Sequence, residues 1–217
     1  MRILPTKEEL ISFEDDISNC FKNKQIRAPI HLSYNNENQL ISIFEEIKDN
    51  DWVLCSWRSH YHCLLKGVPK ELVKKEILEG RSISLCFKDH KVLSSAIVGG
   101  NISIALGIAL DIKRKQQKDK VYCFVGDMTS LTGIFNEAVE YAFNFKLPII
   151  FVIENNELSV CTNTLKTWGY VKHPREADDF WTKHRNYIQK HYNVWYYKYD
   201  LHSKYPHAGI GGTRIQF

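Results

Sequence analysis

The sequence has no long hydrophobic run, and its cysteines form no recognisable framework. No apolar stretch approaches the roughly 20 residues that a membrane-spanning helix needs, and the segment after Met1 is charged, unlike a secretory signal. The six cysteines include no CxxC pair and no zinc-ligand spacing. These absences predict a protein without a membrane span, with reduced thiols, in the cytoplasm.

The chain also lacks a large net charge, internal repeats and low-complexity segments. A net charge of +4 over 217 residues is too small to indicate a nucleic acid partner. Aromatic and basic residues do alternate near 180–199, but a packed helix and strand explain them better than a platform for single-stranded nucleic acid. No GxGxxG follows a strand with an acidic residue about 20 positions later, so a dinucleotide-binding oxidoreductase is the least favoured enzyme class.

Two apolar runs joined by a helical pattern dominate what is present. The run at 121–125 ends just before Asp127, apolar residues recur at helical spacing over 134–145, and the run at 149–153 ends just before Glu154-Asn155-Asn156. A strand, a crossover helix and a parallel strand place both strand ends at the same edge of a sheet. Asp127 and Asn156 are therefore expected to meet at the edge where open α/β sheets bind ligands.

A carboxylate and an amide at that edge suit a magnesium ion that bridges a phosphate. Mg²⁺ prefers oxygen ligands and usually keeps substrate phosphate among them, and the start of the helix near Thr132 would offer N–H groups to the anion. The same residues also allow a structural interpretation, in which Asp127 caps the helix and Asn155-Asn156 forms a turn. These residues alone leave both interpretations open.

The surrounding sequence carries further motifs in a fixed register: Gly126-Asp127, Gly133, Glu137-Ala138, Leu147-Pro148 and Glu154-Asn155-Asn156. This pattern resembles the thiamine-diphosphate motif in the alpha subunit of the decarboxylating component of 2-oxoacid and acetoin dehydrogenases. The resemblance implies that Asp127, Asn156 and the backbone carbonyl of Leu158 ligate Mg²⁺. It also implies that Gly126 and Met128 contact the diphosphate, although Met128 stands where the family has the third glycine of GDG.

A second segment, 52–67, reads WVLCSWRSHYHCLLKG. It resembles the part of the same family in which an arginine meets the diphosphate and a histidine faces the substrate. By this resemblance Arg58 holds phosphate oxygens with its planar fork, and His60 polarises or protonates a substrate oxygen. For either residue taken alone, a solvated or structurally bonded side chain is the alternative.

A third segment, 95–111, reads SAIVGGNISIALGIALD and resembles the family's IVGG segment. The resemblance implies that Val98 holds the aminopyrimidine or the linker of the cofactor through backbone contacts. A glycine-rich turn that enters a core helix is equally consistent with these residues.

Two histidine motifs of the family are missing. Ser84 stands where the family's GKSMH has its histidine, and no HGHS loop is found, since His173 and His207 lack a matching context. These differences keep two alternatives open: a transketolase-like or carboligase subunit acting on a sugar or sugar precursor, and a non-catalytic subunit in which Met128 has spoiled the site.

The resemblance implies a three-layer α/β/α fold with a mainly parallel sheet, which binds thiamine diphosphate and Mg²⁺. Residues 1–217 would form one diphosphate-binding domain, with 1–50 as a helical extension and 174–217 as a C-terminal helix, strand and tail. Local patterns predict helices that begin after the capping box at Thr6, near 40–47 and at 69–80.

The expected partners also follow from the resemblance. The chain is too short to include a pyrimidine-binding domain as well, so a separate beta-type chain would supply it, with two copies of each chain by family analogy. The expected substrate is a small carbonyl compound, a 2-oxoacid or an acyloin, in which the bond next to the carbonyl is cleaved or formed. No nucleic acid and no membrane partner is expected.

Overall fold

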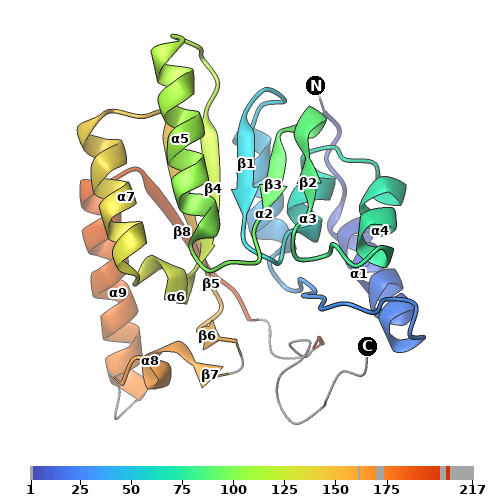
Figure 1. Cartoon of the computed structure of the whole chain (residues 1–217). Helices are drawn as coiled ribbons and strands as arrows, with labels where there is room; N and C mark the ends of the chain where they lie inside the picture. Colours follow the sequence, from blue (N-terminus) through green and yellow to red (C-terminus); the bar gives the residue numbers. More distant parts are fainter. Residues whose placement is uncertain (1, 161, 170–173, 201–203, 206–217) are drawn as a thin grey trace.

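The computed structural model describes residues 2–160, 162–169, 174–200 and 204–205, and within them the chain builds one six-stranded sheet. Its strand order is β2-β3-β1-β4-β5-β8, and every neighbouring pair is parallel except β2 with β3 (Figure 1). The strands are β1 (Trp52–Cys55), β2 (Cys86–Phe87), β3 (Val92–Ser94), β4 (Val121–Gly126), β5 (Ile149–Asn155) and β8 (Val194–Lys198). Two further strands, β6 (Leu158–Ser159) and β7 (Thr162–Asn163), form a separate antiparallel pair.

Helices cover both faces of the sheet (Figure 1). One face packs against α1 (Lys7–Lys22), α2 (Glu37–Glu46), α3 (His60–Leu65) and α4 (Lys70–Leu78). The other face packs against α5 (Gly100–Arg114), α7 (Gly133–Asn144) and α9 (Pro174–His191). The short helices are α6 (Asp127–Ser130), α8 (Thr164–Thr167) and the 3-10 turn η1 (Lys88–His90). The predicted three-layer α/β/α fold with a mainly parallel sheet is confirmed.

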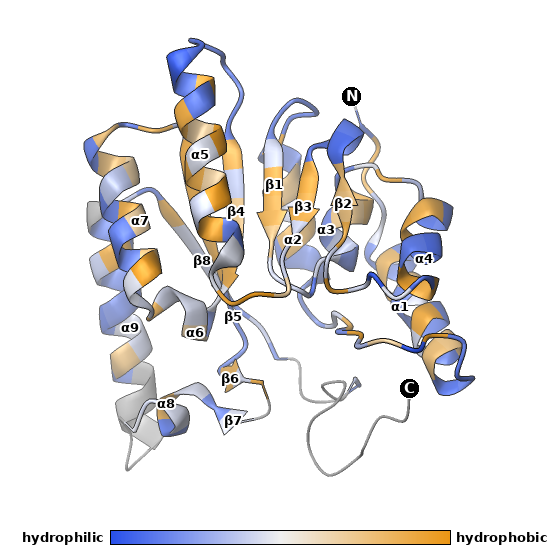
Figure 2. Cartoon of the chain, in the orientation of Figure 1, coloured by the Kyte–Doolittle hydropathy of each residue, from blue (hydrophilic) through white to orange (hydrophobic). Residues whose placement is uncertain are grey.

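Strand alternation explains why the core divides into two layers. Successive side chains of a strand point to opposite faces, so Tyr122 and Phe124 join the core under α1–α4, while Val121, Cys123 and Val125 join the core under α5, α7 and α9. Figure 2 shows the hydrophobic colour concentrated on the strands and the hydrophilic colour on loops such as the one before β4. The continuous apolar runs at 121–125 and 149–153 therefore correspond to strands that are buried on both faces.

The predicted helices after Thr6, near 40–47 and at 69–80 are confirmed as α1, α2 and α4. Thr6 accepts a hydrogen bond from the Glu9 N–H at 3.2 Å and donates its own N–H to the Glu9 carboxylate at 2.7 Å, which completes the capping box. Gly80 follows α4 with φ +86°, a conformation that favours glycine. The short helices α3, α6 and α8 were not predicted, because one or two turns carry too little apolar periodicity to be recognised.

Within the predicted extension, residues 2–50 contain α1 and α2, and both helices pack on the sheet. Leu10, Ile17 and Leu40 are fully buried in the same cluster as Val53 of β1. At the other end, α9 and β8 form as predicted, while most of the predicted tail lies outside the described residues. The division into one domain with two flanking parts remains a prediction.

The helices and the cysteines bear on two sequence-based expectations, the absence of a membrane span and reduced thiols. Among the helices of the described ranges, none has both the length and the apolar composition needed to cross a bilayer. The five cysteines in those ranges are free, and burial raises the pKa of Cys55, Cys63 and Cys123.

Candidate functional site

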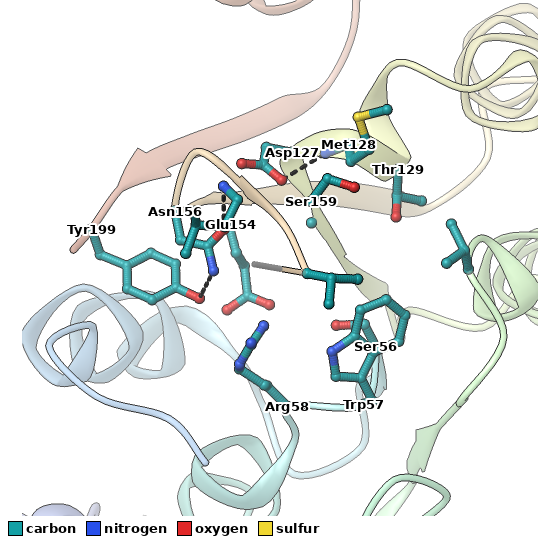
Figure 3. A pocket seen from close by; sticks show the side chains of 14 residues that line it. Ser56, Trp57, Arg58, Asp127, Met128, Thr129, Glu154, Asn156, Ser159 and Tyr199 are labelled. Carbon is teal, nitrogen blue, oxygen red and sulfur yellow. Dashed lines mark hydrogen bonds between the residues drawn. The ribbon is translucent and has the colours of Figure 1, made fainter. Parts of the chain in front are cut away.

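The strand order changes direction between β1 and β4. From β1 the chain moves to β2 and β3 on one side, and then crosses to β4 on the other side and continues outward to β5 and β8. Loops that leave neighbouring strands in opposite directions open a crevice at the carboxyl edge of the sheet, where α/β proteins commonly bind ligands. A pocket lies at this position (Figure 3).

The pocket is lined by residues at or just beyond the carboxyl ends of five strands, and it contains about 620 Å³ of empty space, part of it open to solvent. The lining residues are Ser56, Trp57 and Arg58 after β1; Val98 after β3; Gly126 at the end of β4, with Asp127, Met128 and Thr129 of α6 directly after it; Glu154 of β5, with Asn156, Leu158, Ser159 and Val160 beyond its end; and Tyr199 after β8. All of the predicted site residues except His60 are in this set.

Asp127 is one of two buried acids that line the pocket, with 2% of its surface exposed. One carboxylate oxygen accepts the Met128 N–H at 2.7 Å, and the other accepts the Thr164 hydroxyl at 3.2 Å. Burial raises the pKa of Asp127 to about 6, and these hydrogen bonds and the charge of Arg58 oppose that rise. The negative charge of the Asp127 carboxylate is therefore destabilised by burial, and a cation bound at its oxygens would offset that cost.

The two asparagines after β5 have different roles. Asn155 is fully buried, donates its amide to the Tyr196 hydroxyl at 2.5 Å and accepts the Glu157 N–H at 2.8 Å, so it shapes the turn. Asn156 lines the pocket, accepts the Leu158 N–H at 3.1 Å and donates to the Tyr199 hydroxyl at 3.5 Å. Of the two, Asn156 is therefore the one that lines the pocket.

The loop after Asn156 returns to Asp127. Glu157 and Val160 have positive φ values of 58° and 62°, which is unusual for a β-branched residue such as Val160. The Thr164 N–H donates to the Glu157 carbonyl at 2.9 Å, while its hydroxyl donates to Asp127. These contacts hold Leu158 at the pocket. The left-handed conformation of Glu157 and Val160 on either side of it costs about 1–3 kcal/mol for each residue.

The helix start near Thr132, where the sequence predicted an anion contact, does not line the pocket. Thr132 caps α7 by accepting the Phe135 N–H at 3.4 Å, and it does not line the pocket. The additional turn α6 intervenes, because the hydroxyls of Ser130 and Thr132 donate to the carbonyls of Asp127 and Thr129, both at 2.6 Å. The segment 126–129 meets the pocket instead.

Met128, in place of the family's third glycine, is accommodated without closing the pocket. Its side chain points away from Arg58 and Glu154 in Figure 3, and its N–H is bonded to the Asp127 carboxylate. A Cβ at Gly126 would meet no atom within 4 Å, so this glycine is not required there by close contact in the described structure.

His60 is placed away from the pocket, unlike the substrate contact that the resemblance implied. The side chain is fully buried, with Nδ1 at 2.9 Å from the Glu14 carboxylate and Nε2 at 2.9 Å from the Ser82 hydroxyl. As the first residue of α3, His60 faces α1 instead of the sheet edge. Its observed contacts tie these two helices together.

Sequence reasoning missed Glu154 and Tyr199 as pocket residues. Glu154 is 6% exposed, lies 3.4 Å from Nε2 of His62 and accepts the Tyr197 hydroxyl. Figure 3 shows its carboxylate and the guanidinium of Arg58 pointing toward each other. Glu154 could have been recognised from its place in the ENN motif, whereas Tyr199 carries no local signal.

Comparison with known proteins extends this description. The family described as "Dehydrogenase E1 component" matches residues 6–170. The subunit alpha of acetoin:2,6-dichlorophenolindophenol oxidoreductase from Bacillus subtilis (strain 168) is 31% identical over 158 residues, which are 68% of this chain and 47% of that protein. The Cupriavidus necator protein of the same description is 29% identical over 161 residues, covering 70% of this chain and 48% of that protein.

A plant alpha subunit is similar to about the same share of this chain. Pyruvate dehydrogenase E1 component subunit alpha-3, chloroplastic, from Arabidopsis thaliana is 31% identical over 161 residues, which are 67% of this chain and 38% of that protein. The chain thus spans about half, or less, of the length of these relatives. Since the matched stretch covers most of the chain and includes the pocket loops that follow β1, β3, β4 and β5, the chain belongs to the dehydrogenase E1 component family.

Proposed function

We propose that the chain is an alpha-type subunit of a thiamine-diphosphate- and Mg²⁺-dependent enzyme that cleaves or forms the bond next to the carbonyl of a 2-oxoacid or an acyloin. The observation that carries this proposal is the pocket at the switch point of the sheet. It gathers the carboxylate of Asp127, the amide of Asn156 and the guanidinium of Arg58 from three neighbouring strands. The relatives named above, an acetoin oxidoreductase and a pyruvate dehydrogenase component, support the substrate class.

The donor set fits a magnesium ion. Asp127, the side-chain oxygen of Asn156 and the carbonyl of Leu158 would supply three oxygen ligands, and phosphate and water would complete an octahedron. A side-chain amide oxygen has two lone pairs, and the Leu158 N–H occupies one in Asn156. A divalent cation would also favour the ionised form of Asp127, whose pKa burial raises to about 6.

The remaining pocket residues fit the rest of the cofactor. Arg58 would hold diphosphate oxygens with a charged fork, and the main chain at Gly126 and Met128 would approach the same group. Val98 is 53% exposed at the pocket, so its backbone would be available to the linker or the aminopyrimidine.

Bound thiamine diphosphate supplies a carbon nucleophile and an electron sink for chemistry at a carbonyl. In this proposal the present chain binds and orients the diphosphate end, and a separate beta-type chain contributes the pyrimidine-binding domain, in a complex of two alpha and two beta chains. We assign His60 a supporting role in this chain, because its ring bonds Glu14 and Ser82 rather than reaching the pocket.

Calorimetry tests the cofactor part of the proposal. Thiamine diphosphate is titrated, with and without Mg²⁺, into the wild type, Asp127→Ala and Asp111→Ala, the last being an exposed acid on α5 that pairs with Lys115. Saturable binding that requires Mg²⁺ is expected for the wild type and Asp111→Ala and is expected to be lost in Asp127→Ala. Absence of binding by the wild type, even with the beta-type chain added, would leave a non-catalytic subunit as the explanation.

A second experiment tests the reaction. The reconstituted complex is assayed with a 2-oxoacid, an acyloin and a ketose phosphate, following loss of substrate with Mg²⁺ and thiamine diphosphate present. Turnover of the 2-oxoacid or of the acyloin is expected. Turnover of the ketose phosphate alone would replace the proposed substrate class with the transketolase-like alternative.

A further inference from the structure

Tyr199 is a pocket residue that lies beyond the part of the chain matched by the family. The match ends at residue 170, whereas Tyr199 follows β8 and still lines the pocket with Arg58, Asp127 and Asn156. Its N–H donates to the Asn155 carbonyl at 2.9 Å, which fixes the residue beside the end of β5. The tertiary structure therefore adds a side chain to the site that the family comparison does not assign.

The hydroxyl of Tyr199 has a defined hydrogen-bond arrangement. Its oxygen accepts the side-chain amide of Asn156 at 3.5 Å, at the long end of the hydrogen-bond range. A phenol oxygen that accepts one hydrogen bond still has its own proton to donate. Figure 3 shows the hydroxyl facing Asn156 and the space beside Arg58 and Glu154.

The chemistry of the phenol keeps that proton in place at neutral pH. A tyrosine hydroxyl is both a donor and an acceptor, and its ordinary pKa of about 10 leaves it protonated. A neutral donor beside Arg58 suits an anionic oxygen, because a hydrogen bond to a charged acceptor is stronger than one between neutral groups.

We propose that Tyr199 contacts the bound cofactor by donating its hydroxyl proton to a diphosphate oxygen, while its oxygen holds the Asn156 NH₂ so that the second lone pair of the Asn156 carbonyl oxygen can face the metal. This inference rests on the proposed function and deepens it, because it adds a ligand-binding residue from β8 to those from β1, β4 and β5. Rotating the Asn156 amide by half a turn would place its NH₂ against the Leu158 N–H, so the Leu158 bond fixes which end of the amide faces Tyr199.

The test compares two tyrosines of the same strand region. Tyr199→Phe removes one hydroxyl from the pocket, and Tyr196→Phe removes the hydroxyl that binds Asn155 outside it. Wild type and both variants are titrated with Mg²⁺–thiamine diphosphate and with Mg²⁺–pyrophosphate by calorimetry. Thermal unfolding without ligand checks that each variant is folded, which is expected because both retain the aromatic ring.

Tyr199→Phe is expected to weaken binding of both ligands roughly 10- to 100-fold and to raise the Mg²⁺ concentration needed for half-saturation. Tyr196→Phe is expected to bind both ligands as the wild type does. Unchanged affinity in Tyr199→Phe, or weaker binding of thiamine diphosphate alone, would overturn the inference and leave the proposed function standing. Failure of the wild type to bind either ligand would overturn the proposed function and this inference with it.

Discussion

Replacing Asp127 by asparagine should stabilise the ligand-free protein while abolishing its response to the cofactor. Burial raises the pKa of Asp127 from the ordinary 3.8 to about 6 in the folded chain. One pKa unit corresponds to about 1.4 kcal/mol, so the ionised carboxylate lowers the free energy of unfolding by about 3 kcal/mol at neutral pH. The side chain is 2% exposed, so solvent screening removes little of this effect.

The sign of the pH dependence follows from the direction of the pKa change. The folded state binds the Asp127 proton more tightly than the unfolded state, so the contribution to stability is greatest below about pH 4, falls as the pH rises to about 6 and is level above that. Asparagine does not ionise, so the Asp127→Asn variant does not lose stability as the pH rises. Its NH₂ would face a donor such as the Met128 N–H or the Thr164 hydroxyl, at a cost of about 1 kcal/mol. The net gain at pH 7 is therefore about 2 kcal/mol.

Urea unfolding of the metal-free protein between pH 4.5 and 8 measures this difference, with the exposed Asp111→Asn as the matched control. The free energy of unfolding of Asp127→Asn should exceed that of the wild type by an amount that grows with pH, whereas Asp111→Asn should follow the wild type. Adding Mg²⁺–thiamine diphosphate should stabilise the wild type and leave Asp127→Asn unchanged. If the Asp127→Asn and wild-type curves run parallel across the pH range, the argument from burial is wrong.

Substitutions at three further positions, Arg58, His60 and Phe124, test other parts of the structure. Arg58→Met should weaken pyrophosphate binding in calorimetry roughly 10- to 100-fold, and Arg58→Lys should lie between it and the wild type because lysine lacks the planar fork; equal affinities would exclude a diphosphate contact. His60→Ala should lower the free energy of unfolding by about 3–5 kcal/mol, because Glu14 loses its buried partner; a stable variant that loses only turnover would instead restore the substrate role. Phe124→Ala, which empties a fully buried position stacked on Phe44, should cost about 3–5 kcal/mol in urea unfolding. The half-exposed Phe143→Ala should cost much less, and similar losses at both positions would contradict the assigned core.

The part of the fold that could be predicted from the sequence is the part governed by local patterns. The apolar runs of β4 and β5, the helical spacing of α7 and the capping box of α1 each depend on residues close together in the chain. The helical crossover makes β4 and β5 parallel, which places the loops after both strands at one edge. This was enough to predict that Asp127 and Asn156 share a pocket, and the motif resemblance added Arg58 and Val98.

Tertiary packing decided the rest, because burial and hydrogen-bond partners depend on residues far apart in sequence. His60 lies two positions after Arg58, yet the start of α3 turns it toward Glu14, which is 46 positions away. Asn155 and Asn156 are identical in type, and their different partners in the folded chain, Tyr196 and Tyr199, separate the turn residue from the pocket residue. Tyr199 reaches the site because β8 pairs with β5, a neighbour relationship that no local pattern around residue 199 encodes.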